Sequence, residues 1–295
     1  MKLALIGVGL IGGSFAAALR AAGEVEDVIG FDIDSRAVAA GVDRGIVTRA
    51  AASAAEAVSD ADVVIVATPV GALRATLASV AATLPAHAIV TDVGSTKCSV
   101  IEDAATTLGS AMSRFVPAHP IAGGERPGVQ HADAQLFRDR LAIITPTITT
   151  DPSALATIER LWRSTGARLE RLGPDDHDRV FAAVSHLPHV LAFALVEMIA
   201  RAPDAATKFA HAGAGFRDFT RIAASSHEMW RDVCLANRGP LAAELREYRD
   251  RLTAIQAAIE AGDGTALHEV FSEASAARRG PAAPAPAPFW TPEAR

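Results

Sequence analysis

Short apolar segments alternate with longer segments rich in Ala and Leu over the first 172 residues of the chain. The apolar segments have strand length and lack polar alternation, which is typical of parallel strands buried on both faces. The predicted strands are Leu3–Ile6, Val28–Phe31, Val63–Ala67, Ala88–Thr91, Leu141–Thr145 and Arg168–Leu172. Phe15–Ala22 and Leu155–Ser164 are predicted helices, the second capped by Asp151 or Ser153. This alternation predicts an α/β doubly wound parallel sheet of Rossmann type over residues 1–172.

The pattern changes from Pro174 onward to long helical segments. They are predicted at about 175–201, 204–211, 216–236, 239–260 and 264–277. Residues 173–278 therefore form a predicted all-α second domain. Helices as apolar as "VLAFALVEMIA" exceed what one small bundle buries, so we expect this domain to form a homodimer interface. The Pro/Ala-rich tail, residues 279–295, is predicted to be disordered.

The stretch "GVGLIGGS", residues 7–14, lies between the first predicted strand and the first predicted helix. G-x-G-x-x-G in this context is typical of dinucleotide binding. Gly7 allows a tight turn, Gly9 lets the backbone approach a pyrophosphate, and Gly12 lets the helix pack on the strand. Leu10 and Ile11 complete the loop, whose N–H groups face the phosphates at the positive end of the helix.

An acidic residue, Asp32, ends the second predicted strand, twenty residues after Gly12. A carboxylate there accepts hydrogen bonds from ribose hydroxyls and repels a 2′-phosphate, so the predicted cofactor is NAD. Asp34 and Arg36 follow, which leaves some tolerance of NADP open. Ligands of such a sheet lie beyond the carboxyl ends of its strands, which adds Thr68 and Pro69 to the predicted cofactor site.

Composition excludes several classes of function for this chain of 295 residues. The net charge is -6 without a basic block, which argues against a nucleic-acid partner. No uninterrupted apolar run approaches 18 residues and no signal peptide opens the chain, so we expect no membrane partner. Cys98 and Cys234 lack metal-type spacing and are expected to be reduced, which predicts a cytoplasmic protein.

Four polar stretches carry candidate chemistry: "TDVGSTK" (91–97), "AHPIAGGE" (118–125), "SHLPH" (185–189) and "GAGFRDFTRIAASSHEMWRD" (213–232). His119 can accept a proton near neutral pH, or it can be a structural loop histidine. Ser95 can bind the substrate or His119, or cap the next helix. Arg221 can clamp a carboxylate, or pair with Asp218 or Glu228.

The spacing H-x-x-H of His186 and His189 suggests a metal site. No third ligand stands at metalloenzyme spacing, and H-E-x-x-H is absent, so no metal is predicted.

Together, "GVGLIGGS", "FDID", "TDVGSTK", "HPIAGGE", "SHLPH" and "GFRDFTRIAASSHEMWRD" resemble the prephenate dehydrogenases, which include arogenate and cyclohexadienyl dehydrogenases of tyrosine biosynthesis. The resemblance covers nearly all of the chain up to about residue 277. The "SHLPH" and "DFTRIA…MWRD" motifs are the specific part. The resemblance implies oxidative decarboxylation of prephenate to 4-hydroxyphenylpyruvate with NAD.

The resemblance also implies roles for single residues. His119 matches the catalytic histidine and Ser95 a serine that hydrogen-bonds the same region. Arg221 matches the arginine that binds a substrate carboxylate. The other residues expected at the substrate pocket are His189, Ser185, Glu125, Asp178, Asp218 and Trp230.

Arogenate, or both substrates, stays open as an alternative to prephenate. A β-hydroxyacid-type dehydrogenase or an NAD-sensing protein without activity is a more distant alternative. No regulatory domain is recognised after the helices, so any tyrosine inhibitor is expected to bind at the active site.

Overall fold

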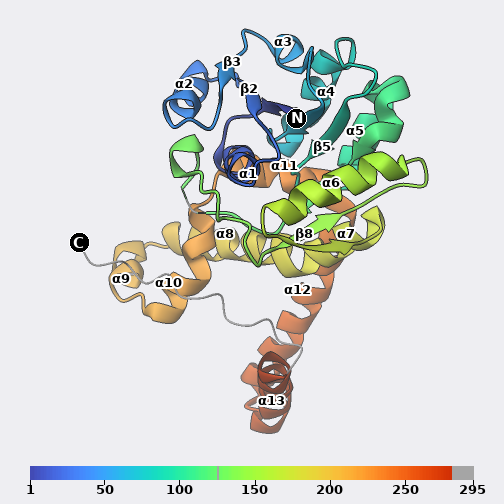
Figure 1. Cartoon of the computed structure of the whole chain (residues 1–295). Helices are drawn as coiled ribbons and strands as arrows, with labels where there is room; N and C mark the ends of the chain where they lie inside the picture. Colours follow the sequence, from blue (N-terminus) through green and yellow to red (C-terminus); the bar gives the residue numbers. More distant parts are fainter. Residues whose placement is uncertain (125, 281–295) are drawn as a thin grey trace. The chain divides into compact units, whose positions relative to one another are not determined.

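The computed structural model of the chain describes residues 1–124 and 126–280. Within these residues the main sheet is parallel, with strand order β3-β2-β1-β4-β5-β6 (Figure 1). Its strands are β1 (Lys2–Ile6), β2 (Asp27–Phe31), β3 (Arg49–Ala50), β4 (Val63–Val66), β5 (Ile89–Asp92) and β6 (Phe115–Val116). Strand order reverses between β1 and β4, which confirms the predicted doubly wound sheet.

Helices cover both faces of this sheet (Figure 1). Leu3 and Leu5 of β1 join the core beneath one set of helices, whereas Ala4 and Ile6 join the core beneath the other. The first set is α1 (Leu10–Ala21), α2 (Ser35–Asp43) and α6 (Pro152–Ser164). The second set is α3 (Ala54–Val58), α4 (Leu73–Ala81) and α5 (Cys98–Thr107). The central strands β1 and β4 are apolar over almost their whole length because side chains on both of their faces are buried, whereas the short edge strand β3 is exposed.

A second sheet, with order β7-β8-β9, corrects the expectation that all strands share one sheet. Its strands are β7 (Ala118–Pro120), β8 (Leu141–Ile144) and β9 (Arg168–Arg171). The chain passes from β6 into β7 through Pro117 alone, and β7 pairs antiparallel with β8. A parallel neighbour in the main sheet would need a long crossover, which this connection lacks. The apolar pattern did not distinguish the two sheets because strands of either sheet can be buried.

The helices that follow pack with the sheets into one compact unit, Met1–Ala242, and a second unit begins at Ala243. α7 (Pro174–Phe181) continues through a π-helical turn, Ala182–His186, into α8 (Leu187–Ala200). The remaining helices are α9 (Ala205–Ala210), α10 (Ala214–Thr220), α11 (His227–Ala236), α12 (Arg238–Ala261) and α13 (Gly264–Arg279). The single helix expected over 216–236 is broken, because Arg221–Ala224 is a 3₁₀ turn and Ser226 caps α11.

The continuous helix Pro174–Ala200 is long and apolar enough, by length and composition, to cross a membrane. Its exposed apolar side chains, such as Val184 and Met198, are equally the kind of surface expected to contact a second copy of the chain. The division at residues 172 and 278 stays a prediction. The predicted tail, residues 279–295, lies almost entirely outside the described residues.

Candidate functional site

The glycine loop lies at the carboxyl edge of the main sheet, between β1 and α1 (Figure 1). Gly7 has φ of +96°, and a Cβ there would lie 2.6 Å from the carbonyl oxygen of Ala67. A Cβ on Gly12 would lie 2.7 Å from the Gly7 oxygen and 2.8 Å from Cβ of Ala67. Gly9 differs, because a Cβ there would meet nothing within 4 Å. The loop is therefore closely packed at Gly7 and Gly12 and open at Gly9. This is the shape that a bound pyrophosphate requires.

Asp32 stands beside this loop at the end of β2. Its carboxylate accepts the N–H of Val8 at 2.8 Å and the N–H of Asp34 at 2.9 Å. These bonds fix the carboxylate and leave each oxygen a lone pair for a ribose hydroxyl. Arg36 is paired with Asp34 by two bonds of 2.9 and 3.1 Å. Thr68, just past β4, has a buried hydroxyl without a hydrogen-bond partner among the described residues, which leaves it available to a bound ligand.

His119 lies on β7, three residues beyond the end of β6. A buried ion pair holds the residue before it. Lys97 Nζ donates to Asp92 Oδ2 at 2.6 Å and to the Ala118 carbonyl at 2.7 Å, and Asp92 Oδ1 accepts the Ala118 N–H at 3.1 Å. Both charged side chains are fully buried. Removing either partner would leave an uncompensated charge, so this clamp fixes the backbone at His119.

His119 belongs to a line of titratable side chains that runs into α7. His119 Nδ1 lies 2.8 Å from His177 Nε2, and His177 Nδ1 lies 2.8 Å from Asp178 Oδ1. Asp178 in turn accepts the backbone N–H groups of Lys97 at 2.7 Å and Cys98 at 2.9 Å, at the start of α5. Phe181 packs against both imidazoles, with ring centroids 4.9 and 4.5 Å away. The line thus joins the first helical turn of α7 to the carboxyl edge of the sheet.

Burial governs the pKa values in this line. Desolvation lowers the pKa of His119 well below its ordinary value, and the nearby charges of His177, Lys97 and His186 act in the same direction. Desolvation also lowers the pKa of His177, although its hydrogen bond to Asp178 opposes the shift. For Asp178, burial acts to raise the pKa, but hydrogen bonds from His177 and the two backbone N–H groups hold it below its ordinary value. His119 and His177 are therefore neutral at pH 7 beside an ionised Asp178.

The "SHLPH" residues lie on the π turn and the start of α8. His186 is fully buried, and its Nδ1 is 3.0 Å from Nδ2 of Asn237. Desolvation lowers the pKa of His186 to about 4. His189 is stacked on Trp230 with centroids 3.6 Å apart, and its Nδ1 is 3.0 Å from the Ser185 carbonyl.

Other predicted substrate residues stand in different surroundings. The charge of Arg221 contributes to lowering the pKa of His189, after desolvation, so the guanidinium lies near this ring. Ser95 is half-buried after β5, and its backbone lies near His186. Asp218 is exposed on α10, and in the described part of the chain it makes none of these contacts. Glu125 lies outside the described residues.

Three residues of this site were not expected from the sequence: His177, Asp92 and Asn237. "PDDHD" has the pattern of a solvated acidic helix start, so nothing marked His177 as buried. Asn237 donates to the Asp178 carbonyl at 2.8 Å as well as facing His186, and a lone Asn near a helix end carries no such signal. Asp92 lies in the polar stretch 91–97, but a salt bridge between residues five apart matches neither helical nor strand periodicity. The sequence therefore did not predict its pairing with Lys97.

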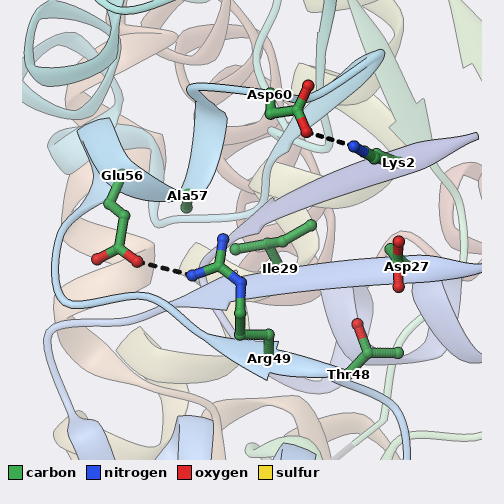
Figure 2. Close-up of a pocket in the computed structure, with 8 residues that line it drawn as sticks. All are labelled: Lys2, Asp27, Ile29, Thr48, Arg49, Glu56, Ala57 and Asp60. Carbon is green, nitrogen blue, oxygen red and sulfur yellow. Dashed lines mark hydrogen bonds and ion pairs between the residues drawn. The ribbon is translucent and has the colours of Figure 1, made fainter.

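Two alternative sites carry no comparable chemistry. Across residues 1–124 and 126–280 no cluster of His, Cys, Asp or Glu has the arrangement of a metal site, and both cysteines are free. A shallow hollow lies beside the first residues of β1 and β2, and Figure 2 shows its charged groups pairing with one another, Lys2 with Asp60 and Arg49 with Glu56. These are exposed ion pairs of small energetic weight.

Comparison with known families identifies the chain. Residues 15–171 match the nucleotide-binding domain of prephenate dehydrogenase, and residues 173–273 match its dimerization domain. The chain belongs to the prephenate dehydrogenase family. The two matched domains account for both the doubly wound sheet and the helical region of this family member.

Relatives within the prephenate dehydrogenase family match over most of their lengths. The prephenate dehydrogenase of Bacillus subtilis is 35% identical over 94% of this chain and 75% of its own. The cyclohexadienyl dehydrogenase of Zymomonas mobilis is 35% identical over 94% of both chains. The crystal structure of prephenate dehydrogenase from A. aeolicus, in complex with hydroxyphenyl propionate and NAD+, superposes with a TM-score of 0.88 at 35% identity, covering 94% of this chain and 97% of that chain.

Proposed function

We propose that this protein catalyses the NAD-dependent oxidative decarboxylation of prephenate to 4-hydroxyphenylpyruvate, with release of CO2. Family membership supports the reaction class. The observation that carries the proposal is His119, held with one ring nitrogen occupied by His177 and neutral at pH 7. A neutral histidine beside a dinucleotide site is the base that oxidation of a ring alcohol requires.

The residues around the glycine loop fit NAD. The open space above Gly9 suits the pyrophosphate, Asp32 suits the ribose hydroxyls, and the Thr68 hydroxyl lacks another partner among the described residues. The predicted cofactor contacts are Gly7, Gly9, Leu10, Ile11, Gly12, Asp32, Thr68 and Pro69. NAD+ when bound supplies a hydride acceptor. The glycine loop and Asp32 would hold its pyrophosphate and ribose at the carboxyl edge of the main sheet.

His119 handles the proton of the reaction. Since Nδ1 faces His177, Nε2 is the nitrogen available to the ring hydroxyl of the substrate. It takes that proton as the C–O bond gains double-bond character and the ring carbon loses its hydride. Cleavage of the bond to the ring carboxylate sends its electron pair into the ring, CO2 leaves, and the proton returns to the phenol oxygen. General-base catalysis of this kind contributes about 10²- to 10⁴-fold.

The remaining residues bind and orient the substrate in this proposal. Arg221 binds a substrate carboxylate, and Ser95 hydrogen-bonds the region of the ring hydroxyl. Tight binding of the ring carboxylate would oppose decarboxylation, so the contribution of Arg221 lies in binding and orientation. Ser185, His189 and Trp230 are proposed to contact the substrate, and Asp178 supports the histidine pair. Asp218 and Glu125 remain predicted substrate contacts from the family resemblance alone.

Arogenate is the second candidate substrate, because a relative 35% identical carries the name cyclohexadienyl dehydrogenase. Arogenate differs from prephenate only at the side chain, which is an amino acid instead of a keto acid. A homodimer and a cytoplasmic location complete the proposal. Tyrosine, which shares the para oxygen but lacks the ring carboxylate, is proposed as a competitive inhibitor at this same pocket.

The test is NADH formation from prephenate, arogenate and a panel of 3-hydroxyacids, with His119→Asn as the matched variant. We expect turnover of prephenate, with arogenate as the alternative. Replacing His119 should lower kcat by about 10²- to 10⁴-fold and leave KM within a few-fold. Turnover of hydroxyacids alone, or NAD binding with no turnover of any substrate, would reject the proposal.

A further inference from the structure

The hydrogen bonds between Asp178 and His119 leave only one consistent arrangement of protons. An ionised carboxylate accepts but does not donate, so His177 Nδ1, at 2.8 Å from Asp178 Oδ1, carries the hydrogen. A neutral imidazole has one N–H, so His177 Nε2 is a bare acceptor. His119 Nδ1, at 2.8 Å from that atom, must then be the donor. Each assignment follows from the one before it.

The start of this line is fixed by the backbone of α5. Asp178 accepts the N–H groups of Lys97 and Cys98, which lie at the positive end of that helix and favour an ionised carboxylate. Asn237 holds the Asp178 carbonyl. His177 is fully buried, so water does not replace either of its bonds. The line is thus anchored at one end and ends at the catalytic histidine.

We propose that His177 is a positioning residue that fixes the tautomer of His119, placing the hydrogen on Nδ1 and the free lone pair on Nε2. The proposal rests on the proposed function for its role in turnover. Without it, the other His119 tautomer would place a hydrogen on Nε2, where the substrate hydroxyl must deliver its proton. His177 also supports the product of that step, because a protonated His119 donates more strongly from Nδ1 than a neutral one.

The charged and titratable groups around His119 come from four elements. Asp92 and Lys97 face it from the end of β5 and the start of α5, His177 and Asp178 from α7, and His186 from the π turn. Asp92 and Lys97 neutralise one another as a buried pair. Asp178 is therefore the unpaired negative charge of this group, and it reaches His119 through His177.

Two substitutions separate the hydrogen bond to His119 from simple packing. In His177→Asn the amide can still donate to Asp178 but is too short to reach His119. In His177→Gln the longer amide places an acceptor where Nε2 stood. We expect His177→Asn to lower kcat by about 10²- to 10⁴-fold with KM for prephenate within a few-fold. His177→Gln should restore kcat to within roughly tenfold of wild type, with the same affinity for NAD+ in both variants.

The pH profile distinguishes a tautomer effect from a structural one. Loss of the acceptor destabilises protonated His119 more than neutral His119, which lowers the pKa of His119. In His177→Asn the acid limb of the kcat/KM profile should therefore move to lower pH by roughly half a unit to one unit. His177→Gln should leave the limb in place. Equal losses in both variants with an unmoved limb, or full kcat in His177→Asn, would overturn the proposal.

The tautomer is also measured without turnover, by ¹⁵N NMR of the histidine rings, with His119→Asn assigning the signals. We expect His119 of the wild-type protein to show the Nδ1–H form, and His177→Asn to show mainly the Nε2–H form with little Nδ1–H remaining. A wild-type Nε2–H form would overturn the inference even in an active enzyme. A wild-type Nδ1–H form in a protein that oxidises no ring alcohol would reject the proposed function and leave the positioning of His119 intact.

Discussion

The glycine loop allows cofactor affinity to be separated from stability by two substitutions of the same size. In Gly9→Ala the new methyl group meets no protein atom within 4 Å, and the backbone φ of -104° suits any residue. Alanine is a poorer N-cap than glycine by a few tenths to about 1 kcal/mol. It regains about 0.4–1 kcal/mol by restricting the unfolded chain. The free energy of unfolding should therefore be nearly unchanged.

The same methyl group occupies the space predicted for the pyrophosphate. Displacing the phosphates removes at least one hydrogen bond to a charged group, which costs about 1.5–3 kcal/mol. The Kd for NAD+ should therefore rise roughly 10- to 150-fold. Isothermal titration calorimetry with NAD+ measures it, and thermal unfolding without cofactor should show an unchanged Tm.

Gly12→Ala should behave in the opposite way. Its methyl group would overlap the Gly7 oxygen and Leu5 Cδ1 at 2.7 Å and Cβ of Ala67 at 2.8 Å, so α1 must move off the sheet. Overpacking of this kind costs about 1–3 kcal/mol. At about 2–4 °C per kcal/mol, Tm should fall by roughly 2–12 °C. Wild-type affinity for NAD+ in Gly9→Ala, or an unchanged Tm in Gly12→Ala, would refute this account of the loop.

Three further predictions concern single side chains. Asp32→Ser should lower kcat/KM with NAD+ about 10- to 100-fold and improve relative use of NADP+, because a repelling carboxylate is lost; an unchanged ratio of the two kcat/KM values would show that Asp32 does not contact the ribose. Arg221→Gln should raise KM for prephenate about 10- to 100-fold with kcat within a few-fold, and a loss in kcat alone would remove Arg221 from substrate binding. The pKa of His186 is about 4 in the folded protein and about 6.5 when unfolded, so the unfolded state binds more protons between these values. The contribution of His186 to the free energy of unfolding is complete above pH 6.5 and falls by about 3 kcal/mol as the pH drops to 4. His186→Asn should remove that part of the decline in the free energy of unfolding measured with urea. An identical decline in both proteins would contradict the burial of a neutral ring.

The sequence by itself determined the features that depend on neighbours along the chain. Strand and helix alternation, the G-x-G-x-x-G loop and the acid twenty residues later each follow from short-range periodicity or spacing. The structure places the loop between β1 and α1 and Asp32 directly after β2, as expected. His119 was identified because a motif surrounds it. These inferences succeed because a parallel sheet brings the carboxyl ends of its strands to one edge whatever lies elsewhere in the chain.

Only the tertiary structure decided what surrounds His119. His177 is 58 residues away along the chain, and Asp178 accepts an N–H from Lys97 across 81 residues. Periodicity carries no information about such pairs, because one acidic helix start looks the same whether it faces solvent or caps another helix. The placement of β8 and β9 in a second sheet was undetermined for the same reason, since burial alone does not specify the partner strand. Local pattern selected the elements and the candidate base, and long-range packing selected which nitrogen of that base is free to react.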